Sequence, residues 1–329
     1  MSQLLYGLQK WWPVLLILLL LVIAVMMLFQ RWNIHQLVTH PNPSTSYDES
    51  VQRIDALKAK EGNLNPVCQT KFLTHGKQTA RTIILVHGYT TCPQQFAELG
   101  QRFYDEGYNV LIAPLPHHGL ADRMTDEQSL IKAEEFTVYA DNVIDIAQGL
   151  GQHVTICGLS LGGAISAWSV QNRSDVDLAV IISPGFSFED IPLGFTSPLA
   201  NIFMMLPATY EWWDSDLKEN NTPPYAYPRY TRRALGEILR LGYGVQAQAE
   251  RAAPAGKAMI VVTNASDVSV DNDVTAQVIK TWQAQGAKLS TYEFPKELAL
   301  DHDLIDPTNA AANIEAVYPK LIELVNTAP

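Results

Sequence analysis

Ser160 stands between glycines in the run GLSLG at residues 158–162. A short apolar run typical of a β-strand leads into this motif, and a helical segment leads out of it. Such a sharp strand-to-helix turn forces unusual backbone angles on its serine and exposes the hydroxyl. The next amide then lies at a helix N-terminus, where an anion is stabilised. We therefore interpret Ser160 as a nucleophile. The alternative is a buried structural serine in an incidental glycine turn.

Two residues later in the chain fit the partners that a nucleophilic serine needs, a base that accepts its proton and an acid that orients the base. His302 is the only histidine after residue 153, and it follows a predicted strand. Asp267 follows the strand before that one. The rival acids, Asp271 and Asp273, fit better as the N-terminal cap and first turn of the next helix. The sequence therefore predicts His302 as base and Asp267 as acid.

An upstream strand ends in the run His87-Gly88-Tyr89-Thr90. Acyl transfer needs two hydrogen-bond donors aimed at the developing oxyanion, one from the residue after the nucleophile and one from another loop. We expect the backbone N–H groups of Leu161 and Tyr89 to be these donors.

The other histidines and the cysteines do not indicate a metal site. His87 has no carboxylate or second histidine at ligand spacing. His117 and His118 lie near Asp122, but adjacent residues rarely direct their side chains at one metal ion. The three cysteines lack the spacing of a zinc site. We expect neither a metal ion nor a cofactor.

Predicted strands and helices alternate through most of the chain. The strands are expected at 82–87, 108–115, 154–158, 178–183, 258–263 and 289–294. The helices are expected at 93–106, 135–150, 161–172, 271–285 and 307–325. Several strands are apolar without alternation, which is typical of a sheet covered on both faces. Strand followed by helix, repeated, predicts an α/β fold with a mostly parallel sheet.

One segment, residues 186–251, interrupts this alternation. It places about 65 residues between two predicted strands, whereas such connections usually take about 2 to 6 residues. The segment is rich in Phe, Tyr and Trp, so we expect a helical lid that covers the sheet with an apolar surface. The alternative is that these aromatic side chains form the core of the insertion itself.

The N-terminal region contains an uninterrupted apolar run of 16 residues, Val14 to Phe29. With its flanks, Trp11 to Trp32, it has 22 residues, or about 33 Å of helix, enough to cross a hydrocarbon core of ~30 Å. A cleaved signal peptide is the alternative, but it would have a shorter apolar region and a cleavage site of small residues. We expect a retained single-pass anchor that contacts the lipid bilayer through residues 11–32.

These observations divide the chain into an anchor at 1–40, a spacer with a short helix at 41–65 and a catalytic domain at 66–329. The α-amine and Lys10 outnumber Arg31 on the other side of the apolar run by one charge. Because positive flanks stay in the cytoplasm, this difference favours a cytoplasmic N-terminus and a periplasmic catalytic domain.

The composition excludes two broad classes of protein. The chain has 23 Lys and Arg against 34 Asp and Glu, a net charge of −11, which repels phosphate backbones. We therefore expect no nucleic-acid partner. Because 47% of the residues are hydrophobic and only 17% are charged, disorder is excluded as the dominant state.

Taken together, residues 66–326 resemble the α/β-hydrolase family, in particular bacterial carboxylesterases and monoacylglycerol lipases. The matching motifs are the strand ending at 87–90, the Gly-Leu-Ser-Leu-Gly-Gly turn at 158–163 and the Asp-x-x-Val loop at 267–270. They occur in the family's order of serine, aspartate and histidine. The anchor and the long aromatic insertion are not part of the family's minimal pattern.

The resemblance implies a serine hydrolase in which Ser160 attacks an ester carbonyl, His302 transfers the proton and Asp267 holds the imidazole. A small uncharged acyl ester, such as a monoglyceride, is the expected substrate. The family also includes thioesterases, acyltransferases and peptidases, which stay as alternatives. A tethered binding protein without turnover is the alternative from another class.

The cysteines bear on the side of the membrane. Cys92 lies three residues after Tyr89, Cys68 lies in a segment expected to form an early strand, and Cys157 lies within a predicted strand. If the domain is outside the cytoplasm, Cys68 and Cys92 can form a disulfide that pins the oxyanion loop. The alternative is three reduced thiols in a domain that faces the cytoplasm.

Overall fold

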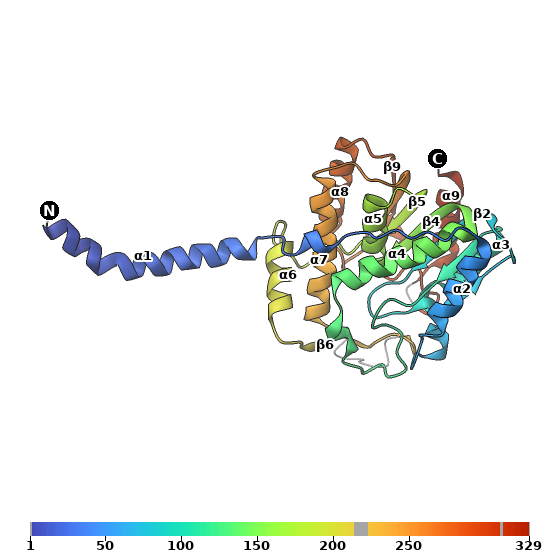
Figure 1. The fold of residues 1–329 in the computed structure, drawn as a ribbon, viewed down its shortest axis with the longest axis horizontal. Coiled ribbons are helices and arrows are strands. Elements are labelled where there is room, and N and C mark those ends of the chain that lie inside the picture. The colour runs from blue at the N-terminus through green and yellow to red at the C-terminus, as the bar shows by residue number, and fades with distance from the viewer. Residues whose placement is uncertain (1, 214–222, 310–311, 329) are drawn as a thin grey trace.

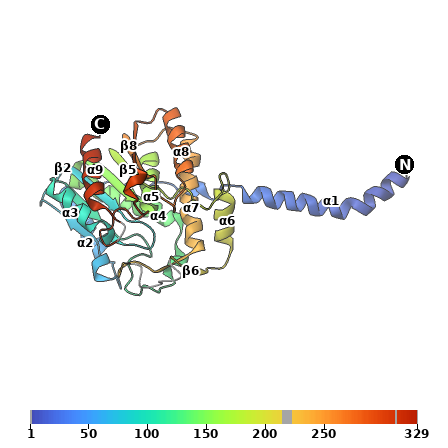
Figure 2. The same cartoon turned by 180° about the vertical axis from the view of Figure 1, so that it is seen from behind.

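A seven-stranded β-sheet forms the centre of the molecule (Figures 1 and 2). The structure is a computed structural model, and it describes residues 2–213, 223–309 and 312–328. In spatial order the strands are β1 (Lys71–Leu73), β3 (Asn109–Ile112), β2 (Thr79–Val86), β4 (Gly151–Leu159), β5 (Leu178–Ile182), β8 (Ala258–Asn264) and β9 (Leu289–Phe294). Only β1 is antiparallel to its neighbour in this sheet. The predicted α/β fold with a mostly parallel sheet is confirmed.

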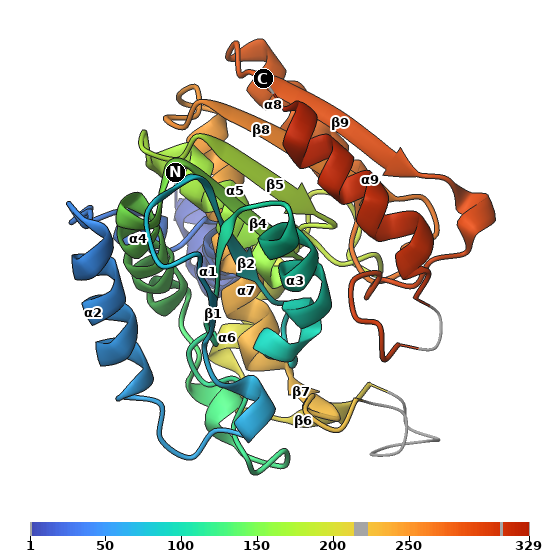
Figure 3. The same cartoon turned by 90° about the vertical axis from the view of Figure 1, so that its right-hand side faces the viewer.

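Helices cover both faces of this sheet. On one face lie α4 (Ala133–Leu150), α5 (Leu161–Asn172) and α8 (Asn272–Ala284). On the other lie α3 (Ala97–Asp105) and α9 (Ile314–Thr327) (Figure 3). Successive residues of a strand point to opposite faces, so in β2 Ile84 packs toward α4 and α5, and Ile83 packs toward α3 and α9. This arrangement explains the apolar strands without alternation.

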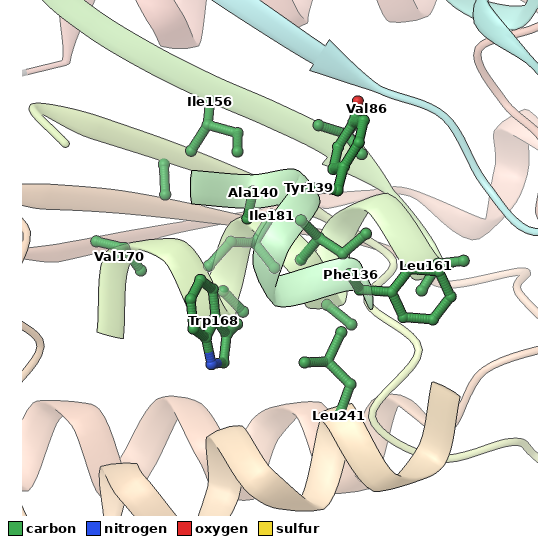
Figure 4. Packing of buried hydrophobic residues seen from close by; sticks show 14 of the residues in the cluster. Val86, Phe136, Tyr139, Ala140, Ile156, Leu161, Trp168, Val170, Ile181 and Leu241 are labelled. Atoms are coloured by element: carbon green, nitrogen blue, oxygen red, sulfur yellow. The ribbon is translucent and has the colours of Figure 1, made fainter. Parts of the chain in front are cut away.

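The insertion between β5 and β8 is not a detached flap. It contains α6 (Thr196–Met205), β6 (Tyr210–Trp212), β7 (Arg229–Thr231) and α7 (Arg232–Ala249). Leu241 of α7 belongs to the same hydrophobic core as Phe136 of α4 and Trp168 of α5 (Figure 4). Helix α7 is therefore part of the main core, and α6 packs against α7.

The aromatic side chains of the insertion differ in their exposure to solvent. Phe186, Tyr227 and Tyr243 are buried and contribute to packing. Phe195 and Trp213 are each 48% exposed. The insertion thus has an embedded side and an exposed aromatic side.

The N-terminal apolar segment forms α1 (Ser2–Leu28), which projects away from the rest of the molecule (Figure 1). Its residues 11–28 have a mean hydropathy of 2.8, and none of this stretch is buried. Length and composition make it the one candidate membrane span in the described part of the chain, although a signal sequence has the same properties. The helix ends at Leu28, earlier than the predicted end of the span at Trp32, because the chain turns to contact the domain.

The segment predicted as a spacer, residues 41–65, is folded onto the domain. It contains α2 (Tyr47–Lys58), which packs against α4. Just before it, Leu37 is 1% exposed and belongs to the main core. The folded domain therefore includes part of the segments assigned to the anchor and the spacer.

A buried cation holds this segment in place. Arg173, which is 1% exposed, forms ion pairs with Asp141 (2.9 Å) and Asp145 (2.6 Å). The same two carboxylates accept hydrogen bonds from the Thr39 hydroxyl (2.6 Å) and the Asn42 N–H (2.9 Å). Breaking one partner of such a network leaves a buried charge uncompensated, which typically costs about 3–5 kcal/mol. The network therefore fixes the chain that links α1 to the domain.

The predicted strands begin and end within three residues of the observed ones. The short helical turns η1 (Ile34–Gln36), η2 (Pro66–Cys68), η3 (Pro93–Phe96), η4 (Glu127–Leu130) and η6 (Lys296–Leu298) lie between the main elements. Two further expectations were wrong. Cys68 ends η2 instead of lying in a strand. Helix α9 begins at Ile314, later than the predicted residue 307, because Asp306 accepts hydrogen bonds from the Thr308 and Asn309 N–H groups in a turn.

Candidate active site

Ser160 lies in the turn between β4 and α5 with φ 59° and ψ −113°, a conformation rare for residues other than glycine. The flanking glycines are required by close packing. A Cβ on Gly162 would lie 2.0 Å from the Val86 carbonyl oxygen, and one on Gly158 would lie 2.2 Å from the Gly162 carbonyl oxygen. The sharp turn expected from the sequence is therefore present, and Ser160 itself stays partly exposed.

Asp267 and His302 meet at the same edge of the sheet. Asp267 Oδ2 accepts a hydrogen bond from His302 Nδ1 at 2.8 Å. Asp267 Oδ1 accepts the N–H groups of Ser269 (2.9 Å) and Val270 (3.3 Å). The Asp267 side chain is fully buried, whereas that of His302 is 19% exposed. Because Nδ1 is engaged, Nε2 is the nitrogen of His302 that is available to accept a proton.

Burial and charge act in opposite directions on this pair. Burial raises the pKa of Asp267, but the hydrogen bond and charge of His302 outweigh burial, and the pKa lies below its ordinary value. Burial lowers the pKa of His302, but the hydrogen bond and charge of Asp267 raise it above its ordinary value. The pair therefore stabilises an imidazolium at His302 with an ionised Asp267 beside it.

The rival acid Asp271 caps α8. Its Oδ1 accepts hydrogen bonds from the N–H groups of Asp273 (2.8 Å) and Val274 (3.0 Å). Asp273 lies in the first turn of the helix. Both residues thus have the positions that the sequence predicts, and within the described residues neither forms an ion pair with His302.

Two backbone amides lie on the loops next to Ser160. Leu161 is the first residue of α5, and Tyr89 follows the turn after β2. Gly88 is close to the nucleophile, since a Cβ on Gly88 would lie 3.6 Å from Ser160 Cβ. Over the ranges that the structure describes, the N–H groups of Leu161 and Tyr89 have no acceptor. Both amides are therefore available to donate to an oxyanion.

Ser160, Asp267 and His302 share one edge because each follows the C-terminal end of a parallel strand, β4, β8 and β9. Among the described residues, no hydrogen bond joins the Ser160 hydroxyl to His302. Catalytic hydrogen bonds are often long without substrate and tighten when substrate binds. The arrangement can therefore support acyl transfer by an oriented serine and histidine.

Residues 77–295 match the family described as serine aminopeptidase, S33 (Hydrolase_4). The chain belongs to this α/β-hydrolase family. Over 175 residues the hydrolase is 26% identical to a thermostable monoacylglycerol lipase from Bacillus sp. (strain H-257). This match covers 51% of the chain and 64% of the relative, slightly less than two thirds of the relative's length.

Solved structures of lipolytic enzymes have the same fold. A metagenome-derived lipolytic enzyme has a TM-score of 0.61 and 17% identity, with 80% of this chain and 99% of that chain covered. The monoacylglycerol lipase of Paleococcus ferrophilus has a TM-score of 0.58 and 15% identity, with 79% and 98% covered. At these identities the likeness shows the fold. The predicted α/β-hydrolase fold is confirmed.

One residue that the sequence analysis missed links two loops of the hydrolase's site. Gln95 Oε1 accepts the Gly88 N–H at 2.8 Å, and Gln95 Nε2 donates to Asp303 Oδ2 at 2.9 Å. An amide side chain can bridge an N–H group and a carboxylate because it both accepts and donates. Gln95 is 1% exposed and connects the oxyanion turn to the His302 loop. In the sequence it is only one polar position of a predicted helix.

Asp303 brings a second ionisable carboxyl close to His302. Burial and the charge of Asp306 raise the pKa of Asp303 to about 6, although the hydrogen bond from Gln95 acts in the other direction. The charge of Asp303 in turn raises the pKa of His302. The loop that carries the proposed base is therefore sensitive to pH near neutrality.

Cys68 and Cys92 form a disulfide, with their Cα atoms 5.3 Å apart. Cys92 directly precedes η3, which contains Gln95, so the bridge lies beside the oxyanion turn. Cys157 is buried, and burial raises the pKa of its thiol to about 12. The disulfide therefore ties the loop after Tyr89 to the segment before β1.

The adjacent histidines face different partners. His117 contacts the carboxylates of Glu127 (2.9 Å) and Glu135 (3.1 Å). His118 Nδ1 lies 2.7 Å from the Pro116 carbonyl oxygen. Their side chains thus do not converge on one point.

The insertion reaches the oxyanion turn through Trp213. Its indole N–H donates to Thr90 Oγ1 at 3.1 Å, and its ring lies 4.3 Å from that of Tyr230 and 6.3 Å from that of Tyr89. The Tyr227 N–H also donates to the Thr90 carbonyl oxygen at 2.8 Å. An aromatic wall of the insertion therefore borders the turn that carries the Tyr89 amide.

Proposed function

We propose that this hydrolase is a membrane-anchored serine hydrolase that cleaves carboxylic esters of uncharged acyl compounds such as monoglycerides. The observation that carries the proposal is the 2.8 Å hydrogen bond between Asp267 and His302, at the same sheet edge as the Ser160 turn. The relationship to monoacylglycerol lipases supports the substrate class. The aromatic wall around Trp213 supports an apolar acyl chain.

The proposed reaction has two steps. Ser160 Oγ attacks the ester carbonyl carbon while His302 Nε2 accepts the hydroxyl proton, and the N–H groups of Leu161 and Tyr89 bind the oxyanion. The carbon–oxygen bond to the alcohol then breaks, and His302 returns the proton to the departing alcohol. A water molecule attacks the acyl-enzyme in the same way and releases the carboxylic acid and free Ser160. The lowered pKa of Asp267 supports its role as an ionised orienting group.

The proposed domain organisation is an anchor through residues 11–28 and a catalytic domain outside the cytoplasm, in the periplasm. The disulfide between Cys68 and Cys92 supports an oxidising compartment. The α-amine and Lys10 support a cytoplasmic N-terminus, because positive flanks stay inside. The insertion at 186–251 is proposed to cover the acyl-binding side of the site.

Cleavage of peptide bonds is the second candidate, because the matching family is described as serine aminopeptidases. The full chain in detergent micelles would be assayed with p-nitrophenyl esters of short to long acyl chains and with aminoacyl p-nitroanilides. We expect turnover of the esters, with a preference among chain lengths. Turnover of the anilides without the esters would replace the proposal by an aminopeptidase.

A protein that binds without turnover is separated from an enzyme by labelling with a fluorophosphonate, which reacts with activated serines. We expect the full chain to be labelled and Ser160→Ala to remain unlabelled. Ser169→Ala is a suitable control, because Ser169 is a buried serine of α5 whose hydroxyl bonds the Ile165 carbonyl. Equal labelling of the Ser160→Ala variant would contradict the proposed nucleophile.

A further inference from the structure

The last turn of α1 is fastened to α6 of the insertion. Asn201 Nδ2 donates to the Leu28 carbonyl oxygen at 2.7 Å and to the Gln30 carbonyl oxygen at 2.8 Å. The Ser197 hydroxyl donates to the Phe29 carbonyl oxygen at 3.3 Å. The Leu28 carbonyl is one of the four that a helix end leaves without a partner in the helix, so Asn201, which is 1% exposed, caps α1 from a distant element. Figures 1 and 2 both show α6 next to the end of α1.

The chain after α1 makes further contacts with the domain, which restrict rotation about this point. Arg31 makes two hydrogen bonds with the Glu250 carboxylate at 2.7 and 2.9 Å. Further along, Arg240 donates to the Asn33 carbonyl oxygen at 3.2 Å. Leu37 is buried in the main core. The anchor and the domain are therefore joined by a continuous series of contacts instead of a free linker.

The segment that contacts the end of α1, residues 191–209, contains no charged residue, although the chain has a net charge of −11. It exposes large apolar side chains to solvent. The exposed fractions are 57% for Leu193, 48% for Phe195, 67% for Met205 and 47% for Leu206. Phe195 packs edge-on against Phe29, with ring centroids 5.5 Å apart. The apolar surface of this segment is therefore continuous with that of α1.

The depth of residues 191–209 in the membrane can be inferred from the length of the apolar helix. Residues 11–28 form 18 residues of apolar helix, about 27 Å long, which nearly equals a hydrocarbon core of ~30 Å. Leu28 then lies at the boundary of the hydrocarbon, and α6, which is fastened there, lies at the same level. Apolar side chains at this level are stabilised by insertion into the headgroup and acyl boundary.

We propose that residues 191–209 form a second membrane contact, held by Asn201 against the end of the anchor, so that the insertion lies in the surface of the lipid bilayer. This inference rests on the proposed role of α1 as an anchor. A second membrane contact also narrows the proposed substrate class to acyl esters that reside in the bilayer. The same insertion continues from Met205 to Trp213 at the oxyanion turn, and thus connects the membrane surface with the site.

The depth of Met205 can be measured with a fluorophore on a single introduced cysteine. Full-length protein carrying Met205→Cys would be labelled in its folded, oxidised form, where Cys157 is buried, and placed in phosphatidylcholine vesicles that contain brominated lipid. We expect the bromine to quench this label. Val138→Cys is the matched control, because Val138 is 56% exposed but lies on α4. Equal quenching at Val138, or none at Met205, would overturn the inference.

A label at Val22→Cys within α1 separates this inference from the proposed anchor. Quenching at Val22 without quenching at Met205 would leave the anchor standing and remove the second contact. Absence of quenching at Val22 would remove both. Cross-linking between the Met205→Cys residues of two chains in the same vesicles would assign the apolar surface to a second copy of the protein, and would also overturn the inference.

The role of Asn201 is tested by Asn201→Leu, which keeps a similar volume and removes the two donors. We expect hydrolysis of a monoacyl ester embedded in vesicles to fall several-fold, with less quenching at Met205→Cys, while hydrolysis of a water-soluble acetyl ester stays unchanged. Ser197→Ala, which removes the longer 3.3 Å bond, should have a smaller effect. Unchanged hydrolysis of the embedded ester, or an equal fall on both substrates, would contradict the clamp.

Discussion

Ser160 and His302 occupy positions where each would be indispensable for acyl transfer. Replacing either by Ala is expected to lower kcat by a factor on the order of 10⁴ or more, since nucleophile and base act as a unit. Steady-state hydrolysis of a p-nitrophenyl ester measures the effect. Asp271→Ala should remove only the cap of α8, with a loss of about 1 kcal/mol in stability and little change in kcat. Near wild-type turnover in Ser160→Ala would refute the assignment.

Gln95 is expected to act through the Gly88 amide, which it holds in place next to the nucleophile. Gln95→Leu leaves this buried N–H without an acceptor, which typically costs about 1–3 kcal/mol of stability, and it releases the turn that positions the Tyr89 amide. A misplaced oxyanion donor should lower kcat about tenfold or more with KM nearly unchanged. Gln171→Leu is the control, because Gln171 is also a buried glutamine, near the end of α5 far from Ser160, which accepts the Trp282 indole N–H at 2.8 Å and donates to the Ala252 carbonyl oxygen. A rise in KM alone would argue against a positioning role.

Asp303 should make the free energy of unfolding depend on pH. Its pKa is raised from 3.8 in the unfolded chain to about 6 in the folded protein, so the stabilisation from its proton is complete below about pH 4 and is lost as the pH rises through about 6. Asp303→Asn cannot lose a proton, and its amide oxygen can still accept from Gln95. The Tm of the variant relative to wild type should therefore increase between about pH 4 and pH 7. Parallel Tm curves over this range would contradict the raised pKa.

At the scale of secondary structure, the sequence carried enough information for the sheet and its covering helices. The central strands are buried apolar runs such as 178–182, which are recognisable without alternation, and the ends of β8 and β9 place Asp267 and His302. The start of α9 was missed because an Asp306 turn replaces the first helical turns, which residue periodicity does not reveal. Gln95 was missed because its two partners, Gly88 and Asp303, are brought together only by tertiary contacts.

The role of the insertion in substrate preference is better tested by a single substitution than by deleting the insertion. Removing residues 190–248 would take most of α7 out of the main core, so the protein would unfold and report nothing about substrate. Trp213→Ala changes a side chain that is 48% exposed beside the oxyanion turn. We expect the ratio of kcat/KM for long-chain to short-chain esters to fall, with little change for an acetyl ester.

The control for Trp213→Ala is Val138→Ala, which removes an apolar side chain of similar exposure, 56%, from α4. This variant should keep the wild-type ratio of long-chain to short-chain hydrolysis. An equal loss on all chain lengths in Trp213→Ala would mean that the aromatic wall supports the oxyanion turn and does not contact the acyl chain.

For the whole molecule, the oxidation state of the cysteines reports the side of the membrane. Protein from native membranes would be unfolded without reduction, alkylated and analysed by mass spectrometry. With the domain in the periplasm, Cys157 alone should be alkylated, because Cys68 and Cys92 are joined. Three alkylated thiols would contradict the bridge and weaken the proposed topology. The side of the membrane could not be derived from the sequence beyond a difference of one charge across the span.

The Arg173 network also bears on whether a protease could release the catalytic domain from its proposed anchor. Enzymes on stalks can be shed, because a protease cuts the exposed stalk and releases an active soluble form. Here the chain from Gln30 to Asn42 lies against the domain through Arg31, Thr39 and Asn42, and Leu37 is sealed in the core. A cut there requires local unfolding, and it would strip out part of the core. We therefore expect limited proteolysis to release little soluble form of the proposed esterase, so that it would act at the membrane of its proposed anchor.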